Sequence, residues 1–154
     1  MRVIVNTSPL IALDRIRRLD LLRQLFGQVV RPQSVLDEVE AGRARTLDPQ
    51  TLFHAAWIAT EPDPPEMVLR KELGAGETAA LALAVKTGAD LIVLDDLQAR
   101  LVAAGLGLKI TGTAGVILAA HQAGFEPDLS KALQDLLAAG FHLSPQLLRH
   151  LKAV

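Results

Sequence analysis

The fold is decided by the stretch at residues 73–100, which reads L-G-A-G-E-T-A-A-L-A-L-A-V-K-T-G-A-D-L-I-V-L-D-D-L-Q-A-R. Glu77 opens an Ala/Leu-rich run that continues for about three helical turns without a helix breaker. The apolar run Leu91–Leu94 is too short for a helix and is typical of a parallel strand covered on both faces. Asp95 and Asp96 follow at its carboxyl end, where two adjacent carboxylates repel each other and require a cation or a basic neighbour.

The composition indicates one folded domain without covalent cross-links. The chain has 154 residues, of which 50% are hydrophobic and 21% are charged, and this balance argues against disorder. No apolar run reaches the roughly 18 residues that a membrane span needs, and the N-terminus lacks the long apolar stretch of a signal peptide. We therefore expect a single cytoplasmic domain over residues 1–154. The absence of cysteine excludes disulfides and thiolate metal sites, which leaves carboxylates and histidines as possible metal ligands.

The charge balance gives no general attraction to nucleic acid. The formal net charge is −1, so any binding of RNA or DNA must come from a local basic patch. Such a patch is suggested by five arginines that lie close together in the sequence: Arg15, Arg17, Arg18, Arg23 and Arg31. A cluster of this kind is most often a solvated face, and the alternative is contact with a phosphate backbone or a partner.

Short apolar runs alternate with helical patterns along the chain. We predict strands at residues 2–5, 29–30, 56–60, 91–94 and 108–110. The segments between them are helical, the first with Ser8 as N-cap and Pro9 at its first position, and the last with Ser144 and Pro145 in these roles. This alternation predicts an α/β three-layer sandwich on a mostly parallel five-stranded sheet, with extra C-terminal helices.

Polar side chains collect at the carboxyl ends of the predicted strands. Asn6 ends the first strand, Asp95 and Asp96 end the fourth, and Glu38 and Glu77 lie on helices that could face the same end. Ligands of an open parallel sheet bind beyond the carboxyl ends of its strands, so these residues converge if the first and fourth strands are neighbours. Clustered carboxylates without cysteine suit a hard divalent cation such as Mg²⁺ or Mn²⁺, and sites of this kind usually act on phosphates.

Each of these residues also has a purely structural interpretation. Glu77 could only complement the positive end of its helix, and Glu38 could be a solvated residue at the edge of a half-buried helix. Asp95 or Asp96 could cap the following helix, and Asn6 could be a turn residue.

Two residues beyond the aspartates leave the same choice open. Arg100 lies one helical turn after them and could reach back, either within a site or as a plain salt bridge. Thr113 follows the fifth strand and could face the site, although capping of the next helix is the more common role.

Four motifs, in their order and spacing, resemble the PIN-domain superfamily, in particular an uncharacterised branch related to VapC-like toxin ribonucleases. They read V-I-V-N-T-S-P-L-I-A-L, V-V-R-P-Q-S-V-L-D-E-V, G-A-G-E-T-A-A-L-A-L-A and L-I-V-L-D-D-L-Q-A-R, the last followed by G-L-K-I-T-G-T. The resemblance implies strand order 3-2-1-4-5 and an Mg²⁺- or Mn²⁺-dependent ribonuclease. It places the family's second, third and fourth acids at Glu38, Glu77 and Asp96, with Asp95 beside the last. Thr7 and Ser8 match the hydroxyl positions after the first acid.

The chain departs from this family at the first acid. Most PIN nucleases resemble D-T-S here, whereas this chain has Asn6, which can ligate through its carbonyl oxygen but carries no charge. Two functions therefore remain open. The first is a metal-dependent endoribonuclease, for which the resemblance suggests the role of toxin in a toxin–antitoxin pair. The second is a catalytically weak or inactive module that binds RNA or a partner protein. The resemblance also implies a small antitoxin-like partner and a homodimer, for which the apolar region Leu129–Val154 offers a surface.

Overall fold

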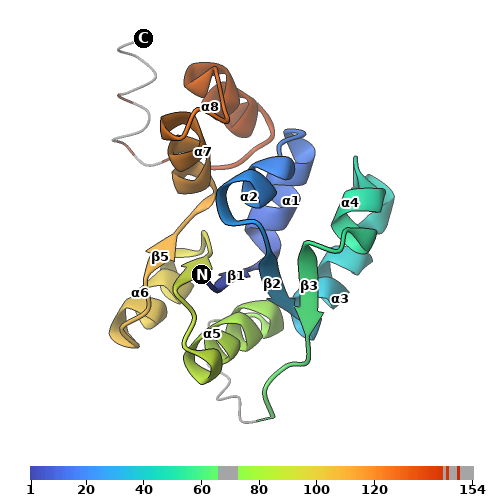
Figure 1. Ribbon diagram of the computed structural model, residues 1–154, viewed down its shortest axis with the longest axis vertical. Helices are drawn as coiled ribbons and strands as arrows, with labels where there is room; N and C mark the ends of the chain where they lie inside the picture. The colour runs from blue at the N-terminus through green and yellow to red at the C-terminus, as the bar shows by residue number, and fades with distance from the viewer. Residues whose placement is uncertain (66–72, 144, 146–148, 150–154) are drawn as a thin grey trace.

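The sheet has the strand order that the resemblance implies. The computed structural model describes residues 1–65, 73–143, 145 and 149 (Figure 1). These residues contain a sheet of five strands in the order β3-β2-β1-β4-β5, and every neighbouring pair is parallel. The strands are β1 (Val3–Val5), β2 (Val29–Pro32), β3 (Ile58–Glu61), β4 (Leu91–Val93) and β5 (Ile110–Thr111).

Helices cover both faces of the sheet, as expected for a three-layer α/β sandwich. One apolar cluster joins α5 and α6 to one face, and a second joins α1, α2, α7 and α8 to the other. α3 packs against both α1 and α5. The helices are α1 (Thr7–Arg15), α2 (Asp20–Phe26), α3 (Gln33–Ala41), α4 (Pro49–His54), α5 (Ala75–Thr87), α6 (Leu97–Gly105), α7 (Thr113–Gln122) and α8 (Leu129–Ala138), with a 3-10 turn at Arg43–Arg45. Over the described ranges, no helix combines the length and apolarity required to cross a membrane.

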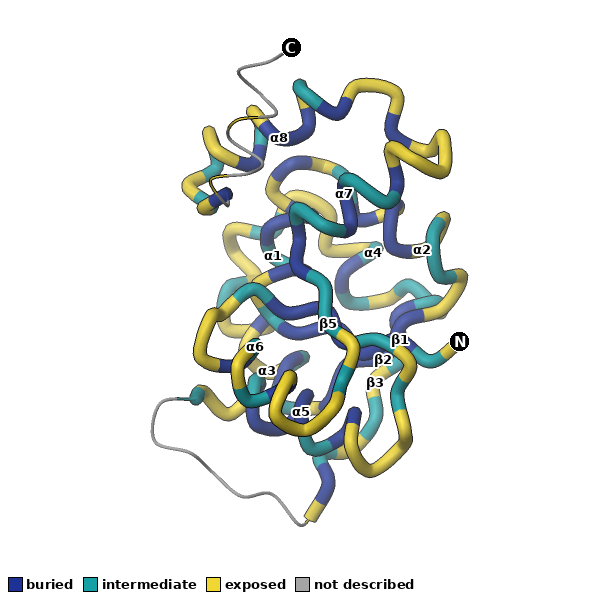
Figure 2. Tube along the Cα trace, turned by 90° about the vertical axis from the view of Figure 1, so that its left-hand side faces the viewer, coloured by how far each residue is buried: buried dark blue, intermediate teal, exposed yellow. Residues whose placement is uncertain are grey.

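The central strand β1 is buried on both faces, as are β2 and most of β4 (Figure 2). Val3 and Val5 belong to the cluster of α1 and α2, whereas Ile4 belongs to the cluster of α5 and α6. Alternate residues of a strand point to opposite faces, so a strand covered on both sides is mainly apolar. This explains why the apolar runs of the sequence predict the strands without any polar alternation.

Several predicted boundaries are wrong by a few residues. The N-cap of α1 is Asn6 rather than Ser8, because the backbone of Asn6 is still extended and the helix begins at Thr7. The fifth strand begins at Ile110 instead of Leu108, since the turn after α6 extends further than its glycines suggest. The cap predicted at Ser144 lies outside the described residues, as does most of the C-terminal part of the predicted dimer surface.

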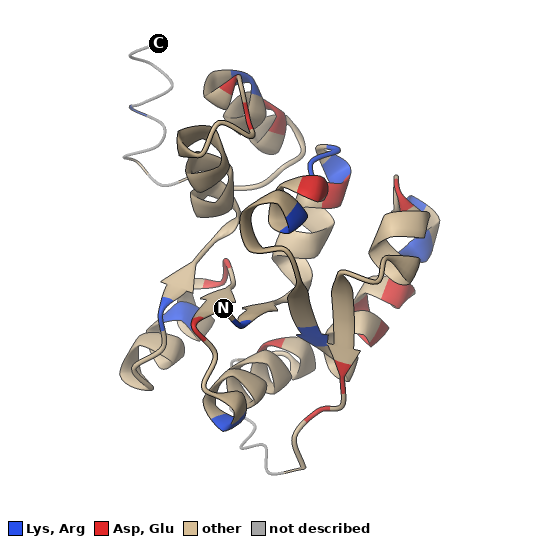
Figure 3. Ribbon diagram, viewed as in Figure 1, with Lys and Arg blue, Asp and Glu red and all other residues tan. Residues whose placement is uncertain are grey.

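The arginines that are close in sequence are spread over several elements and do not form one patch. Figure 3 shows Lys and Arg positions on separate helices and strands. Arg18 pairs with Glu126 and with Asp135, and Arg23 pairs with Asp20. A third member of the cluster, Arg31, is buried, and of the exposed members Arg15, Arg17 and Arg23 the last is paired within its own helix. Arg18 ties the N-terminal part of the chain to α8, and the continuous basic face that the sequence suggested is absent from the described part of the chain.

Arg31 is a buried cation without an ion pair among the described residues. Its side chain is only 2% exposed, its Nε donates to Thr60 Oγ1 at 3.2 Å, and its Nη1 has no acceptor. Burial lowers the pKa of Arg31 to about 10, so the guanidinium still carries its charge at neutral pH. An uncompensated buried charge opposes folding.

We expect Arg31→Met to stabilise the protein. Methionine keeps most of the side-chain volume and removes the buried charge, a change of the kind that is neutral to stabilising by about 1 to 4 kcal/mol. A gain of 1 kcal/mol corresponds to a rise in Tm of about 2 to 4 °C for a chain of this size, which a thermal melt measures. The exposed and paired Arg23 provides the control, because Arg23→Met should shift Tm little. A lower Tm for Arg31→Met would show that the guanidinium contributes a needed interaction.

Candidate active site

Asn6 lies at the carboxyl end of the central strand. Its backbone N–H donates to the carbonyl oxygen of Val93 at 3.0 Å, which continues the pairing of β1 with β4. The extended backbone of Asn6 continues the alternation of β1, so its side chain lies on the face of Ile4, beneath α5. The side chain is 3% exposed, and its Oδ1 is buried without a donor. An acceptor oxygen is therefore left unused at the centre of the sheet.

Glu38 connects the starts of two other helices. Its Oε2 accepts a hydrogen bond from Thr7 Oγ1 at 2.7 Å, and its Oε1 accepts one from the backbone N–H of Gly76 at 2.7 Å. A Cβ atom at position 76 would lie 2.6 Å from Oε1, so only glycine allows this approach. The carboxylate of α3 thus holds the first turns of α1 and α5 together.

Glu77 is the acid with the most perturbed environment. It is in the first turn of α5, where its Oε1 accepts from the backbone N–H of Gly74 at 3.3 Å, while its Oε2 is buried without a donor. Burial raises the pKa of Glu77, and the negative charges of Asp96 and Glu38 raise it further, against the opposing effect of the Gly74 hydrogen bond. These charge interactions show that the three carboxylates are near one another.

Asp96 has two roles at once. It is the N-cap of α6, where a carboxylate oxygen accepts from the backbone N–H of Ala99 at 2.9 Å, so the predicted capping role is confirmed. Its charge also acts on Glu77. The structural and functional interpretations of this residue are therefore compatible.

Asp95 is held differently from its neighbour. Its Oδ1 accepts from the backbone N–H of Thr113 at 2.7 Å, and its Oδ2 accepts from the hydroxyl of Thr113 at 2.6 Å. Both oxygens are thus engaged, and Asp95 ties β4 to the start of α7. Thr113 is not the N-cap of α7, which is Gly112, and instead turns its hydroxyl to Asp95.

Sequence reasoning missed the part played by two glycines. Gly76 and Gly112 each permit a close approach of side chains from elsewhere in the chain. A Cβ atom at position 112 would lie 2.7 Å from Asp95 Oδ1 and 3.1 Å from Arg100 Nη1. Because these neighbours are distant in sequence, only the order of the strands could have predicted the contacts.

The carboxylates do not form a closed ligand shell. Within residues 1–65 and 73–143, no three His, Cys, Asp or Glu side chains form a group that could hold a metal ion. Glu38 is turned toward Thr7 and Gly76, and Asp95 is turned toward Thr113. The unused oxygens Asn6 Oδ1 and Glu77 Oε2 nevertheless fit a hard divalent cation, which binds carbonyl and carboxylate oxygens.

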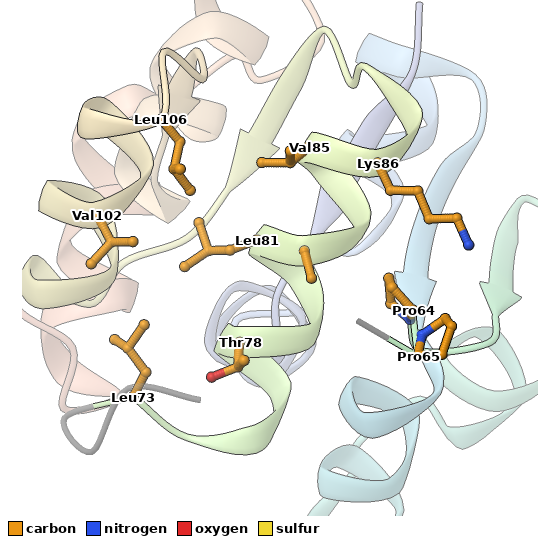
Figure 4. Close-up of a pocket in the computed structure, with 10 residues that line it drawn as sticks. Pro64, Pro65, Leu73, Thr78, Leu81, Val85, Lys86, Val102 and Leu106 are labelled. Atoms are coloured by element: carbon orange, nitrogen blue, oxygen red, sulfur yellow. The ribbon is translucent and has the colours of Figure 1, made fainter. Parts of the chain in front are cut away.

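A large groove lies between α5, the helix that carries Glu77, and α6. It has a volume of about 570 Å³ and is lined largely by aliphatic side chains of α5 and α6, including Leu81, Val85, Val102 and Leu106 (Figure 4). Thr78 is part of this lining, but none of the predicted site acids is. The groove is therefore distinct from the carboxylate cluster.

Comparison with known proteins identifies the family. A family model described as a PIN domain matches residues 2–153, which is nearly the whole chain. The chain belongs to the PIN domain family. PIN domains are generally nucleases that depend on divalent metal ions. The sheet order 3-2-1-4-5 of this PIN domain confirms the fold that the sequence predicted.

A solved structure supports the fold independently. The chain is similar to a PilT N-terminus domain protein from the hyperthermophilic archaeon Sulfolobus solfataricus P2, with a TM-score of 0.51 and 13% sequence identity. The match covers 94% of this chain and 100% of that protein. At this identity the similarity concerns the fold alone. No curated protein matches the chain.

We expect Asn6→Asp to tighten Mn²⁺ binding and to destabilise the metal-free protein. The change puts a negative charge where a neutral oxygen has no donor, beside the end of β4 that leads into Asp95 and Asp96. A tenfold gain in affinity requires only about 1.4 kcal/mol, which calorimetric titration can resolve. A thermal melt in EDTA should show a lower Tm, because like charges repel.

The control for Asn6→Asp is Ser8→Asp, since Ser8 is exposed and lies two residues further along. It adds the same charge outside the buried position, in the first turn of α1, where a negative charge favours the helix. Ser8→Asp should therefore leave the Mn²⁺ affinity unchanged and should not lower Tm. Equal Mn²⁺ affinity for Asn6→Asp and the natural protein would mean that Asn6 is a turn residue only.

Glu77 should make the metal-free protein less stable as the pH rises. Because its pKa is raised in the folded state, the folded protein binds the proton more tightly than the unfolded chain does. The resulting stabilisation is complete below the ordinary Glu pKa of about 4.3 and is lost as the pH rises through the raised pKa. In EDTA, Glu77→Gln should therefore melt above the natural protein at pH 7, and the difference should shrink toward pH 4. A difference that does not depend on pH would contradict this origin.

Proposed function

We propose that this PIN domain is an endoribonuclease that depends on Mg²⁺ or Mn²⁺. The observation that supports it most is the pair of buried oxygens without donors, Asn6 Oδ1 and Glu77 Oε2, at the carboxyl end of the parallel sheet. Ligand sites of open parallel sheets lie at this end. The choice of RNA over DNA rests on the resemblance to VapC-like toxin ribonucleases.

In this proposal the cation is held by Asn6, Glu38, Glu77 and Asp96. Bound there, it supplies Lewis-acid polarisation of a phosphate oxygen and a lower pKa for a coordinated water. The chain's own contribution is orientation. Asp96 is fixed by its cap to Ala99, and Glu38 is fixed by Thr7 and Gly76. Asp95, whose oxygens are both engaged by Thr113, acts as a positioning residue for the segment that carries Asp96.

A second candidate function is a module that binds RNA or a partner protein without cleaving it. Two observations favour it: Asn6 replaces the charged first ligand, and the described acids do not assemble into a metal-binding group. A neutral first ligand weakens the binding of a divalent cation, so the metal could be absent at ordinary concentrations.

A role as the toxin of a toxin–antitoxin pair is the finer part of the proposal. It is supported by the resemblance to VapC-like toxins, and a small antitoxin-like protein and a homodimer belong to it. None of these features is needed for the cleavage chemistry, so the ribonuclease proposal does not depend on them.

The decisive experiment is cleavage of RNA by the purified chain with Mn²⁺, Mg²⁺ or EDTA. We expect cleavage with either cation and none in EDTA. Glu77→Gln should reduce the rate at least about a hundredfold, because a metal ligand contributes several kcal/mol to the stabilisation of the transition state. Glu40→Gln is the matched control, since Glu40 is an exposed acid of α3 that pairs with Arg43 and should leave the rate unchanged.

Single-stranded DNA of the same sequence tests the choice of nucleic acid. If the natural protein binds RNA without cleaving it and only the Asn6→Asp variant cleaves, the second candidate function is correct. If Glu77→Gln cleaves as fast as the natural protein, the activity does not arise at this site.

A further inference from the structure

Arg100 lies beside the carboxylate cluster in an unusual setting. It is half-buried, in the first turn of α6, one turn after Asp96. Its Nη1 and the Oδ1 of Asp95 lie 3.1 Å and 2.7 Å from the position that a Cβ atom of Gly112 would occupy. The guanidinium and the carboxylate therefore flank the same glycine from two sides. This contact depends on the fold, because Gly112 lies between β5 and α7.

The expected salt bridge with the aspartates is not formed. In the part of the chain that the structure describes, Arg100 has no ion pair, and its side chain donates no hydrogen bond. The two oxygens of Asp95 accept instead from the N–H and the hydroxyl of Thr113. Among the described residues, the donors of Arg100 therefore have no acceptor, although an acidic site lies beside them.

This arrangement differs from that of the other cations. Arg18, Arg23 and Arg43 form ion pairs with acids near them. Among the described residues, Lys109 has no ion pair either, but it is exposed and precedes β5, at the opposite end of the sheet from the carboxylates. Arg31 also lacks an ion pair there, but it is almost completely buried. Arg100 combines partial burial, donors without a described acceptor and proximity to the acids.

We propose that Arg100 binds a phosphate oxygen of the RNA at the edge of the carboxylate cluster. The proposal rests on the proposed function. Glu38, Glu77, Asp95 and Asp96 make this end of the sheet negative, so an approaching phosphate is repelled unless a cation compensates. A guanidinium offers paired N–H donors that match two phosphate oxygens, and its planar geometry fixes the orientation of the phosphate.

Gly112 keeps the space that this binding needs. It is buried, and a side chain there would press on both Asp95 and Arg100. A methyl group would push Asp95 Oδ1 aside and crowd Arg100 Nη1, which disturbs the arrangement of the two side chains. Gly112→Ala should therefore weaken RNA binding in the same direction as loss of the Arg100 charge.

The test is the salt dependence of RNA binding by the natural protein and by Arg100→Gln. Fluorescence anisotropy with a short labelled single-stranded RNA in EDTA measures affinity without cleavage over a series of KCl concentrations. Each phosphate contact contributes about 0.7 to the slope of log Kd against log salt on a single strand. We expect Arg100→Gln to lower the slope by about this amount and to weaken binding at low salt, whereas Arg100→Lys should keep the slope.

Lys109→Gln is the matched control, because it removes the same charge from the far end of the sheet, and its slope should equal that of the natural protein. With Mn²⁺, Arg100→Gln should raise KM by about tenfold and change kcat much less, since the contact is made in the bound substrate as well as in the transition state. Thermal melts of the variants show whether the fold is kept.

The outcomes separate this inference from the proposed function. If the natural protein binds and cleaves RNA and Arg100→Gln has an unchanged slope and KM, the inference is wrong and the ribonuclease proposal remains. An unchanged slope together with tighter Mn²⁺ binding would show that Arg100 only screens the carboxylates. If the natural protein neither binds nor cleaves RNA, both are wrong.

Discussion

Burial of β1 on both faces is the constraint on which the rest of the structure depends. This strand pairs with β2 on one side and β4 on the other, and its side chains enter both apolar clusters. A parallel strand can be covered in this way only if helices return the chain across both faces. Those helices then begin at the carboxyl edge, which brings the starts of α1, α3, α5 and α6 together there. The candidate site is a consequence of this topology.

The sequence predicted the architecture because the central strands β1 and β4 are apolar throughout. Leu91–Leu94 and the run ending at Val5 are recognisable without knowledge of their neighbours, since nearly every residue in them is buried. Strand order is different, because local patterns do not encode which strand lies next to which. The order came from the resemblance. Boundaries were less accurate where, as at Asn6, the extended backbone continues one residue beyond the apolar run.

The sequence predicted the acids of the candidate site but not the contacts that hold them in place. Carboxylates at strand ends and helix starts are visible in the sequence, as Glu77 and Asp96 show. The supporting contacts depend on pairs that are far apart in the chain, such as Glu38 with Gly76 and Asp95 with Thr113. The predicted basic patch is wrong for the opposite reason. Arginines that are close in the sequence lie in different surroundings in the fold: Arg18 pairs with Asp135 of α8, whereas Arg31 is buried in β2.

The two hydrogen bonds of Glu38 have a thermodynamic consequence for any ligand of the site. A ligand that draws this carboxylate toward itself leaves the Thr7 hydroxyl and the Gly76 N–H without their shared acceptor, at a cost of about 1 kcal/mol for each bond. Binding of a ligand at the site is therefore linked to the order of the first turns of α1 and α5. The observed affinity for the ligand is lower than the intrinsic one, because binding loosens these two turns. The backbone amides of these two turns should therefore change their environment when a ligand binds, although the ligand does not contact them.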